Sequence, residues 1–175
     1  MTMTVVMGVS GCGKTTIAAG IARATGWELL EGDAFHPTAN IAKMKAGVPL
    51  TDEDRWPWLR AIAARAGELR VQGRSCVVAC SALKKSYRDV LLGDRADTNL
   101  VYLRGSHALI AERLARRRNH FMPPGLLESQ FATLEEPGPE EDPIIADIDA
   151  TPEAITASVM ASLGGRKKDS REIPP

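Results

Sequence analysis

Residues 8–15 read Gly8-Val9-Ser10-Gly11-Cys12-Gly13-Lys14-Thr15. They fit the pattern G-x-x-x-x-G-K-[ST], which forms a phosphate-binding loop between a β-strand and an α-helix. The neighbouring sequence agrees, because an apolar run precedes the loop at residues 4–8 and an Ala-rich helical pattern follows it at residues 14–25. The alternative, a chance match in a glycine-rich turn, does not account for this strand, loop and helix order.

The residue types in this loop suit a nucleotide. Glycines allow backbone angles and close approach that a side chain would block, and successive amide groups at a helix N-terminus point at phosphate oxygens. Lys14 supplies a charge for the β and γ phosphates, and the Thr15 hydroxyl can ligate Mg²⁺. We therefore expect ATP and Mg²⁺ as cofactors. The expected nucleotide contacts are Gly8, Val9, Ser10, Gly11, Cys12, Gly13, Lys14, Thr15 and Thr16.

Outside the loop, short apolar runs alternate with longer helical patterns, which predicts βαβ units and a parallel sheet. Such units form a three-layer α/β sandwich whose right-handed crossovers bring the loops after each strand to one edge, where ligands bind. We expect one domain over residues 1–165, and a flexible tail over residues 166–175 after Gly164-Gly165. The expected strands are 4–8, 27–31, 76–80, 100–103 and 144–148, and the expected helices are 14–25, 39–46, 51–72, 84–92, 108–117, 126–134 and 151–163.

Composition narrows the classes of function. The chain has 175 residues, with 22 Lys plus Arg and 22 Asp plus Glu, so it lacks the basic excess of a broad nucleic-acid surface. Three cysteines, Cys12, Cys76 and Cys80, with no C-x-x-C pair favour a reducing cytosol over a disulfide framework. Cys12 is either a low-pKa thiol or a passive small residue, and we favour the second. The N-terminus shows neither a signal peptide nor a membrane span, so we expect a cytoplasmic protein.

An acid after the second expected strand indicates a second substrate. Asp33 lies in Glu31-Gly32-Asp33-Ala34-Phe35-His36-Pro37, at the sheet edge where the phosphate loop also lies. A carboxylate there can accept a proton from an attacking hydroxyl or hold Mg²⁺ through water. The alternative is that Asp33 only caps the following turn. We favour the functional role because no Asp follows residues 76–80, the strand from which we would otherwise expect the acid that helps to hold Mg²⁺.

Cationic side chains follow the strand at residues 76–80. The segment reads Ser81-Ala82-Leu83-Lys84-Lys85-Ser86-Tyr87-Arg88-Asp89. Such donors suit an anionic, hydroxyl-rich small molecule. The alternative is a solvated helix start, although cations oppose the dipole at a helix N-terminus. Arg55 is either a further clamp on the ligand or the partner of its acidic neighbours, and the sequence leaves both open.

A basic helix end runs into residues 119–125, which contain two prolines and a glycine. This pattern indicates a mobile lid, about residues 117–137, that brings arginines onto the phosphates and keeps water out. The alternative is that the arginines only complement a helix C-terminus. We take Arg117 as the candidate catalytic arginine, although the pattern does not separate it from Arg113, Arg116 and Arg118.

Together these segments resemble the gluconokinase family, relatives of the shikimate and adenylate kinases. The resemblance extends from about Val5 to Leu163. The matching segments are 7–15, Glu31-Gly32-Asp33-x-x-His36-Pro37, Asn40-Ile41-x-Lys43-Met44, Gly47-x-Pro49-Leu50-Thr51-Asp52-x-Asp54-Arg55-x-Pro57-Trp58-Leu59, Cys80-Ser81-Ala82-Leu83-Lys84-Lys85-x-Tyr87-Arg88-Asp89, Arg117-x-x-His120-Phe121, Ser129-Gln130-Phe131-x-x-Leu134-Glu135-x-Pro137 and Asp147-x-Asp149.

The resemblance implies transfer of the ATP γ-phosphate to the 6-hydroxyl of D-gluconate, which gives 6-phospho-D-gluconate. It also implies Mg²⁺, a five-stranded parallel sheet in the order 2-3-1-4-5, a lid and commonly a homodimer. By position, Lys14, Asp33 and Arg117 would be catalytic, and Thr15 and Asp33 would hold the metal ion. The implied substrate contacts are Asp33, His36, Arg55, Lys84, Arg88 and Gln130.

Two other functions fit parts of the pattern. One is a kinase for another small hydroxy acid, such as shikimate. The other is a nucleotide-dependent switch or assembly factor with no small substrate, against which the cationic segment Ser81–Asp89 argues.

Overall fold

Five parallel strands form a single sheet in the computed structural model, which describes residues 1–93, 97–116 and 124–169. The strand order is β2-β3-β1-β4-β5, so the first strand lies at the centre and the order expected from the resemblance is confirmed. The strands are β1 (Met3–Met7), β2 (Glu28–Glu31), β3 (Cys76–Ala79), β4 (Thr98–Arg104) and β5 (Ile144–Asp147).

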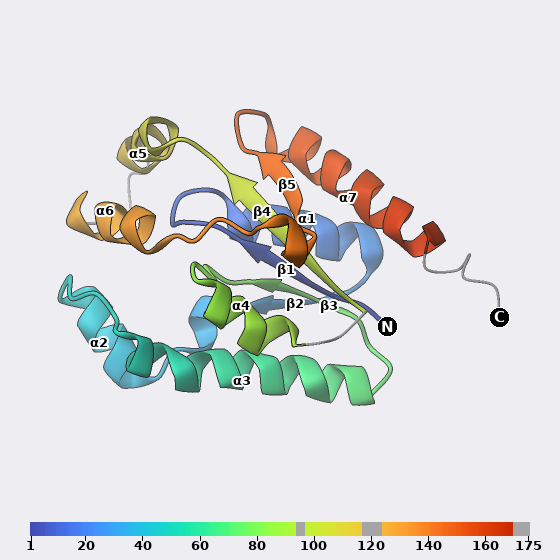
Figure 1. The fold of residues 1–175 in the computed structure, drawn as a ribbon, viewed down its shortest axis with the longest axis horizontal. Helices are drawn as coiled ribbons and strands as arrows, with labels where there is room; N and C mark the ends of the chain where they lie inside the picture. Colours follow the sequence, from blue (N-terminus) through green and yellow to red (C-terminus); the bar gives the residue numbers. More distant parts are fainter. Residues whose placement is uncertain (94–96, 117–123, 170–175) are drawn as a thin grey trace.

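Helices cover both faces of this sheet (Figure 1), as the alternating pattern predicted. The α-helices are α1 (Lys14–Thr25), α2 (Thr38–Lys45), α3 (Asp52–Val71), α4 (Lys85–Leu92), α5 (His107–Arg116), α6 (Pro124–Thr133) and α7 (Pro152–Asp169). Helices α1 and α7 lie on one face and α3 and α4 on the other, while α2, α5 and α6 gather at the end of the molecule where the phosphate loop lies. The described residues also form two short 3₁₀ turns, η1 (Gly32–Phe35) and η2 (Pro139–Glu141). None of the helices in the described ranges is both long and apolar enough to cross a membrane.

The central strands β1 and β3 are buried throughout because each of their faces is covered by helices. Along β1, Val6 belongs to a buried cluster that contains Ile17 and Ile21 of α1. Its neighbour Val5 belongs to a second cluster that contains Trp58 and other side chains of α3. The two-residue period of a strand thus divides its side chains between two cores.

Helix α3 begins where its sequence predicted. The Thr51 side chain accepts a hydrogen bond from the Asp54 amide, and the Asp54 carboxylate accepts one from the Thr51 amide, so the capping box is complete. Leu59, Ile62, Ala66 and Leu69 recur at helical spacing along α3 and are buried. This cap places the first turn of α3 beside the phosphate loop end of the sheet (Figure 1).

Helix α7 is longer than the sequence predicted. It runs on to Asp169, whereas the two glycines at positions 164 and 165 predicted its end near Leu163. Glycine in a helix costs about 1 kcal/mol relative to alanine. Contacts beyond the glycines offset this cost, because Arg166 donates hydrogen bonds to the carbonyl of Asp142 at 2.7 Å and to its carboxylate at 3.0 Å. Part of the tail expected at residues 166–175 is therefore helical, and residues 170–175 lie outside the described ranges.

Candidate active site

The phosphate loop follows β1 and needs glycine at defined positions. Gly8, Gly11 and Gly13 have positive φ angles of 143°, 85° and 99°. A side chain at Gly8 would place its Cβ 2.9 Å from the carbonyl oxygen of Leu103 and 2.8 Å from the sulfur of Cys12. Cys12 is itself buried, which supports the interpretation of this residue as a small packing group.

Hydrogen bonds hold this loop from within and tie it to its surroundings. The Gly8 amide donates to the Ser81 carbonyl at 3.3 Å, so the loop is joined to the end of β3. The Lys14 ammonium donates to the Val9 carbonyl at 3.1 Å. The Ser10 amide donates to Oε1 of Gln130 at 2.7 Å, and this bond links the loop to helix α6. A side chain from the C-terminal third of the chain therefore reaches the loop directly.

Two acids at the end of β2 lie beside the loop. The Thr15 hydroxyl donates to the Glu31 carboxylate at 3.0 Å. Asp33 follows in η1, where Gly32 packs so closely that an added Cβ would lie 2.5 Å from the Ala79 carbonyl. The end of β2 is thus pressed against the end of β3. Sequence reasoning missed Glu31, although its place two residues before Asp33 at a strand end was a usable signal.

One cavity of about 230 Å³ joins the loop to most of the expected substrate residues. Lys14 and Asp33 both line it, as sequence reasoning required of an acid that acts near the phosphates. His36, Arg55 and Gln130 line the same cavity, so residues from four separate segments meet here. The remaining walls come from α2, α3, α6 and the segments beside them: Ser10, Met44, Val48, Pro49, Leu50, Trp58, Ser81, Leu83, Leu126, Ser129 and Thr133.

A second cavity of about 280 Å³ lies along the other part of the loop. Gly11, Gly13 and Thr16 line it from the loop and α1, and Arg113 and Arg116 line it from α5. Its other walls are Cys12, Ile17, Ala150, Pro152 and Ile155. The phosphate loop therefore lines two cavities. This arrangement is expected of a loop that lies between a nucleotide and the molecule that accepts its phosphoryl group.

His36 is held in the first cavity by stacking. Its ring lies 4.1 Å from that of Trp58 with 17° between the ring planes, and Nδ1 lies 3.4 Å from the amide nitrogen of Asn40. Burial lowers the pKa of His36 from its ordinary value, with the charge of Asp33 opposing and that of Arg55 adding to the shift. The imidazole is therefore neutral at neutral pH. One ring nitrogen can donate a hydrogen bond to a hydroxyl group, and the other can accept one from it.

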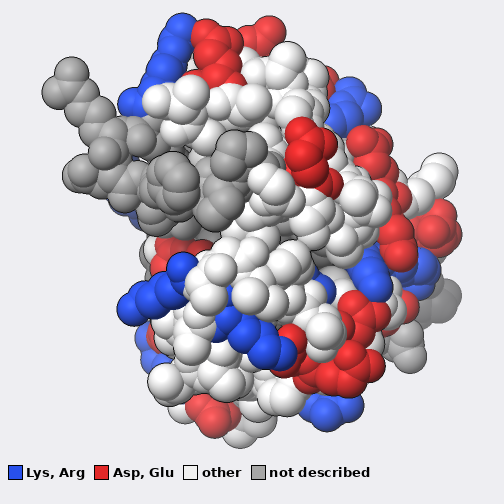
Figure 2. Space-filling model, turned by 90° about the vertical axis from the view of Figure 1, so that its left-hand side faces the viewer, with Lys and Arg blue, Asp and Glu red and all other residues white. Residues whose placement is uncertain are grey.

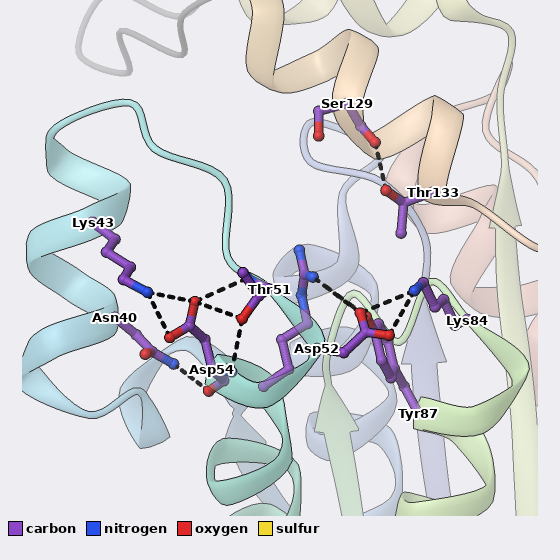
Figure 3. Close-up of polar contacts among 10 residues, drawn as sticks. Asn40, Lys43, Thr51, Asp52, Asp54, Lys84, Tyr87, Ser129 and Thr133 are labelled. Atoms are coloured by element: carbon purple, nitrogen blue, oxygen red, sulfur yellow. Dashed lines mark hydrogen bonds and ion pairs between the residues drawn. The ribbon is translucent and has the colours of Figure 1, made fainter.

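Asp52 is the centre of a polar cluster beside this cavity (Figure 3). The Lys84 ammonium donates to both of its oxygens at 2.9 and 2.8 Å, and the Tyr87 hydroxyl donates to Oδ1 at 2.5 Å. The hydrogen bonds from Lys84 and Tyr87 lower the pKa of Asp52. Arg55 donates to the Tyr87 hydroxyl at 3.3 Å and lies 3.9 Å from Asp52. The cluster joins the first turn of α3 to the start of α4.

Comparisons with known proteins agree on the family. A family model described as "AAA domain" matches residues 3–137. A gluconokinase of Gluconobacter oxydans (strain 621H) is 49% identical over 156 residues, which cover 89% of this chain and 88% of that protein. This chain belongs to the gluconokinase family. A thermoresistant gluconokinase of Escherichia coli (strain K12) is 41% identical over 157 residues and covers 89% of this chain and 90% of its own length.

The solved structure of a gluconokinase from Sinorhizobium meliloti 1021 is similar throughout. It superposes with a TM-score of 0.88 at 42% identity, covering 97% of this chain and 95% of its own. The P-loop kinase fold and the gluconokinase resemblance expected from the sequence are therefore both confirmed.

Two cations that the gluconokinase resemblance implied as substrate contacts form ion pairs with carboxylates of the protein. Lys84 lies beside the cavity, paired with Asp52, and its side chain is 30% exposed. Arg88 is buried: Nε and Nη2 donate to the carboxylate of Glu141 at 2.6 and 2.8 Å. Its Nη1 donates to three carbonyl oxygens, at 3.1 Å from Ala82, 3.2 Å from Leu83 and 2.9 Å from Glu135.

The expected substrate contact of Arg88 is thus replaced by a structural role. Ala82 has a φ of 44°, a left-handed conformation that is unfavourable for a residue with a Cβ. Arg88 holds the carbonyl of this strained residue in the turn between β3 and α4. The preceding carbonyl, that of Ser81, accepts the Gly8 amide, so the same turn supports the phosphate loop.

The arginines expected in the lid are only partly described. Arg117, our candidate catalytic arginine, lies outside the described ranges, as do Arg118 and the rest of residues 117–123. Arg113 donates to the Ile148 carbonyl, and Arg116 pairs with Glu112. Arg113 and Arg116 both line the second cavity, together with residues of the phosphate loop.

The surface around the site carries both signs of charge. Figure 2 views the end of the molecule that lies at the left of Figure 1, and acidic and basic side chains are interspersed there. Among the described residues of this face, neither sign of charge forms a single continuous field.

Proposed function

We propose that this protein transfers the γ-phosphate of ATP to the 6-hydroxyl of D-gluconate, giving 6-phospho-D-gluconate and ADP. The observation that carries the proposal is the cavity in which Lys14, Asp33 and Arg55 meet. A phosphate-binding cation, a carboxylate and a second cation in one cavity suit a phosphoryl acceptor that is both an alcohol and an anion. The proteins named gluconokinase at 41–49% identity support the same assignment.

The chain's own residues divide the chemistry between them. Asp33 accepts the proton of the attacking hydroxyl, and Lys14 stabilises the charge that spreads over the transferring phosphoryl group. The neutral His36 and Gln130 offer hydrogen bonds to the hydroxyl groups of the sugar acid. The Gln130 side chain also accepts a hydrogen bond from the Ser10 amide, which joins helix α6 to the phosphate loop.

The donor set beside the loop supports Mg²⁺ as cofactor. The hydroxyl of Thr15 and the carboxylates of Glu31 and Asp33 are hard oxygen ligands, which Mg²⁺ prefers. Thr15 and Glu31 are already within hydrogen-bonding distance of each other at 3.0 Å. When bound, Mg²⁺ would neutralise charge on the β and γ phosphates.

Other parts of the proposal rest on the sequence and the family resemblance. They are the domain over residues 1–165, a lid over about residues 117–137 with Arg117 acting on the phosphates, a homodimer and a cytoplasmic location. Analytical ultracentrifugation of the purified chain tests the dimer, and a monomer at all concentrations would contradict it.

The second cavity is assigned to the base of ATP, because the phosphate loop, α1 and α5 together form its walls.

A coupled assay tests the activity. The purified protein is mixed with ATP, Mg²⁺ and D-gluconate, and 6-phospho-D-gluconate is detected through its NADP-dependent dehydrogenase. We expect product in proportion to enzyme, and no comparable rate with shikimate. Equal rates on shikimate would favour the other hydroxy-acid kinase, and ATP hydrolysis that gluconate does not accelerate would favour a nucleotide switch.

A further inference from the structure

We propose that Asp52 and Tyr87 position Arg55 to bind the substrate carboxylate, and so set the preference for a sugar acid over a neutral polyol. The inference rests on the proposed function, because it concerns the acceptor in the same cavity. Arg55 lines that cavity, whereas Asp52 and Tyr87 lie behind it and act through Arg55.

Arg55 is held on two sides. Its Nη1 donates to the Tyr87 hydroxyl at 3.3 Å, and its guanidinium carbon lies 5.5 Å from the centre of the Tyr87 ring. The side chain is 18% exposed and lies 3.9 Å from the Asp52 carboxylate. A long arginine side chain has many rotamers, and a rigid partner reduces the entropy lost when its planar fork binds a ligand.

Tyr87 is a rigid partner because it is itself fixed. The residue is buried, and its ring meets that of Trp56 edge-on at 5.4 Å and 78°. Its hydroxyl donates to Asp52 at 2.5 Å while it accepts from Arg55. The hydrogen bonds therefore run in one direction, from Arg55 through Tyr87 to Asp52. A hydroxyl that donates a hydrogen bond to a carboxylate is a better acceptor for the guanidinium, because hydrogen bonds in a chain polarise one another.

The charges of this cluster fit a single carboxylate on the ligand. Two cations, Arg55 and Lys84, share one carboxylate, that of Asp52, so the cluster carries an excess of positive charge. Lys84 contacts both oxygens of Asp52, whereas Arg55 has only a long contact to it. Arg55 is the cation that also lines the cavity, and an arginine fork can bind a carboxylate through two parallel hydrogen bonds. A ligand carboxylate at Arg55 leaves the hydroxyl chain in the cavity that Asp33 and Lys14 line.

Calorimetry with a matched pair of ligands tests this inference. D-gluconate and D-gluconamide differ only in the charged carboxylate, and the ratio of their dissociation constants measures its recognition. We expect the wild-type protein to prefer gluconate by about tenfold or more, the effect of a charge-assisted hydrogen bond, and Arg55→Met to lose the preference. Tyr87→Phe keeps the ring, and should reduce the preference by roughly three- to tenfold, as expected for one hydrogen bond.

The variant Asp52→Asn distinguishes two possible roles of Asp52, which are to position Arg55 and to neutralise the positive charge of the cluster. This change increases the positive charge of the cluster, so neutralisation alone predicts tighter gluconate binding, whereas positioning predicts a smaller preference for gluconate. Glu53→Gln is the control, because Glu53 is exposed in the same helical turn and the change in charge is the same. The control should keep the wild-type ratio.

Each outcome has a defined meaning. A wild-type ratio in Asp52→Asn, Tyr87→Phe or Arg55→Met, or selectively tighter gluconate binding by Asp52→Asn, overturns the inference but leaves the proposed function standing. Wild-type protein that neither binds nor phosphorylates gluconate refutes the proposed function and the inference with it. Urea unfolding of each variant shows whether it folds, and if Asp52→Asn does not, the more conservative Tyr87→Phe decides.

Discussion

Replacing Arg88 with methionine should cost this protein much of its stability. The side chains of Arg88 and Glu141 are 1% and 8% exposed, so their ion pair is removed from water. Methionine fills a similar volume but leaves the Glu141 carboxylate buried without its partner. The change also removes the donor from the carbonyl oxygens of Ala82 and Glu135, whereas Leu83 keeps the hydrogen bond from the Glu135 amide at 2.8 Å.

The magnitude follows from the loss of one member of a buried pair. Breaking such a pair by removing one partner costs about 3–5 kcal/mol, because an uncompensated charge stays buried. For a domain of this length each kcal/mol lowers the melting temperature by roughly 2–4 °C, so we expect a decrease of about 10 °C. The double variant Arg88→Met with Glu141→Leu removes both charges and should recover a large part of the loss.

Urea unfolding followed by circular dichroism measures the cost, with Arg104→Met as the matched control. Arg104 contacts Asp147 with the same two-bond geometry, at 3.0 and 3.0 Å, but the two side chains are 46% and 68% exposed. Solvent screens an exposed pair, so the control should unfold near the wild-type midpoint. If Arg88→Met were no less stable than Arg104→Met, burial would not be the source of the stabilisation, and the structural role assigned to Arg88 would be refuted.

Four further outcomes are expected. Lys14→Ala should lower kcat for gluconate phosphorylation by about a hundredfold or more, and full turnover would show that the loop is misassigned. Asp33→Asn should reduce kcat far more than ATP affinity, whereas a change only in the Mg²⁺ dependence would make Asp33 a metal-positioning residue. Burial lowers the pKa of His36 from 6.5, so the unfolded chain binds the proton first as the pH falls. The neutral His36 side chain therefore contributes its full stabilisation above about pH 6.5, and this contribution is lost as the pH falls below that value. Between about pH 7.5 and about pH 5.5, the free energy of unfolding should fall more in wild type than in His36→Gln. Burial raises the pKa of Cys76 to about 11 and that of Cys80 to about 12, so iodoacetamide should alkylate these thiols only after unfolding, and mass spectrometry of the native protein checks this.

The structure corrects sequence reasoning where burial decides the role of a charge. Arg88 and Lys84 lie four residues apart in one cationic segment, and nothing local distinguishes them. Arg88 points into the protein because Glu141, far along the chain, supplies a buried carboxylate for it. The length of α7 has a similar cause, since Arg166 contacts Asp142 beyond two glycines that local propensity treats as an end.

The phosphate loop, the parallel sheet and the place of Asp33 at the sheet edge could be derived from the order of residues. Each depends on local features: glycines at required backbone angles, two-residue and 3.6-residue periods, and the rule that parallel strands end at one edge. The partners of the charged side chains could not be derived in this way. Asp52 meets Lys84 and Tyr87, and Ser10 meets Gln130, only because packing of the helices on the sheet brings distant segments together. A charge acts on its nearest neighbours in space, and those neighbours are known only once the chain has folded.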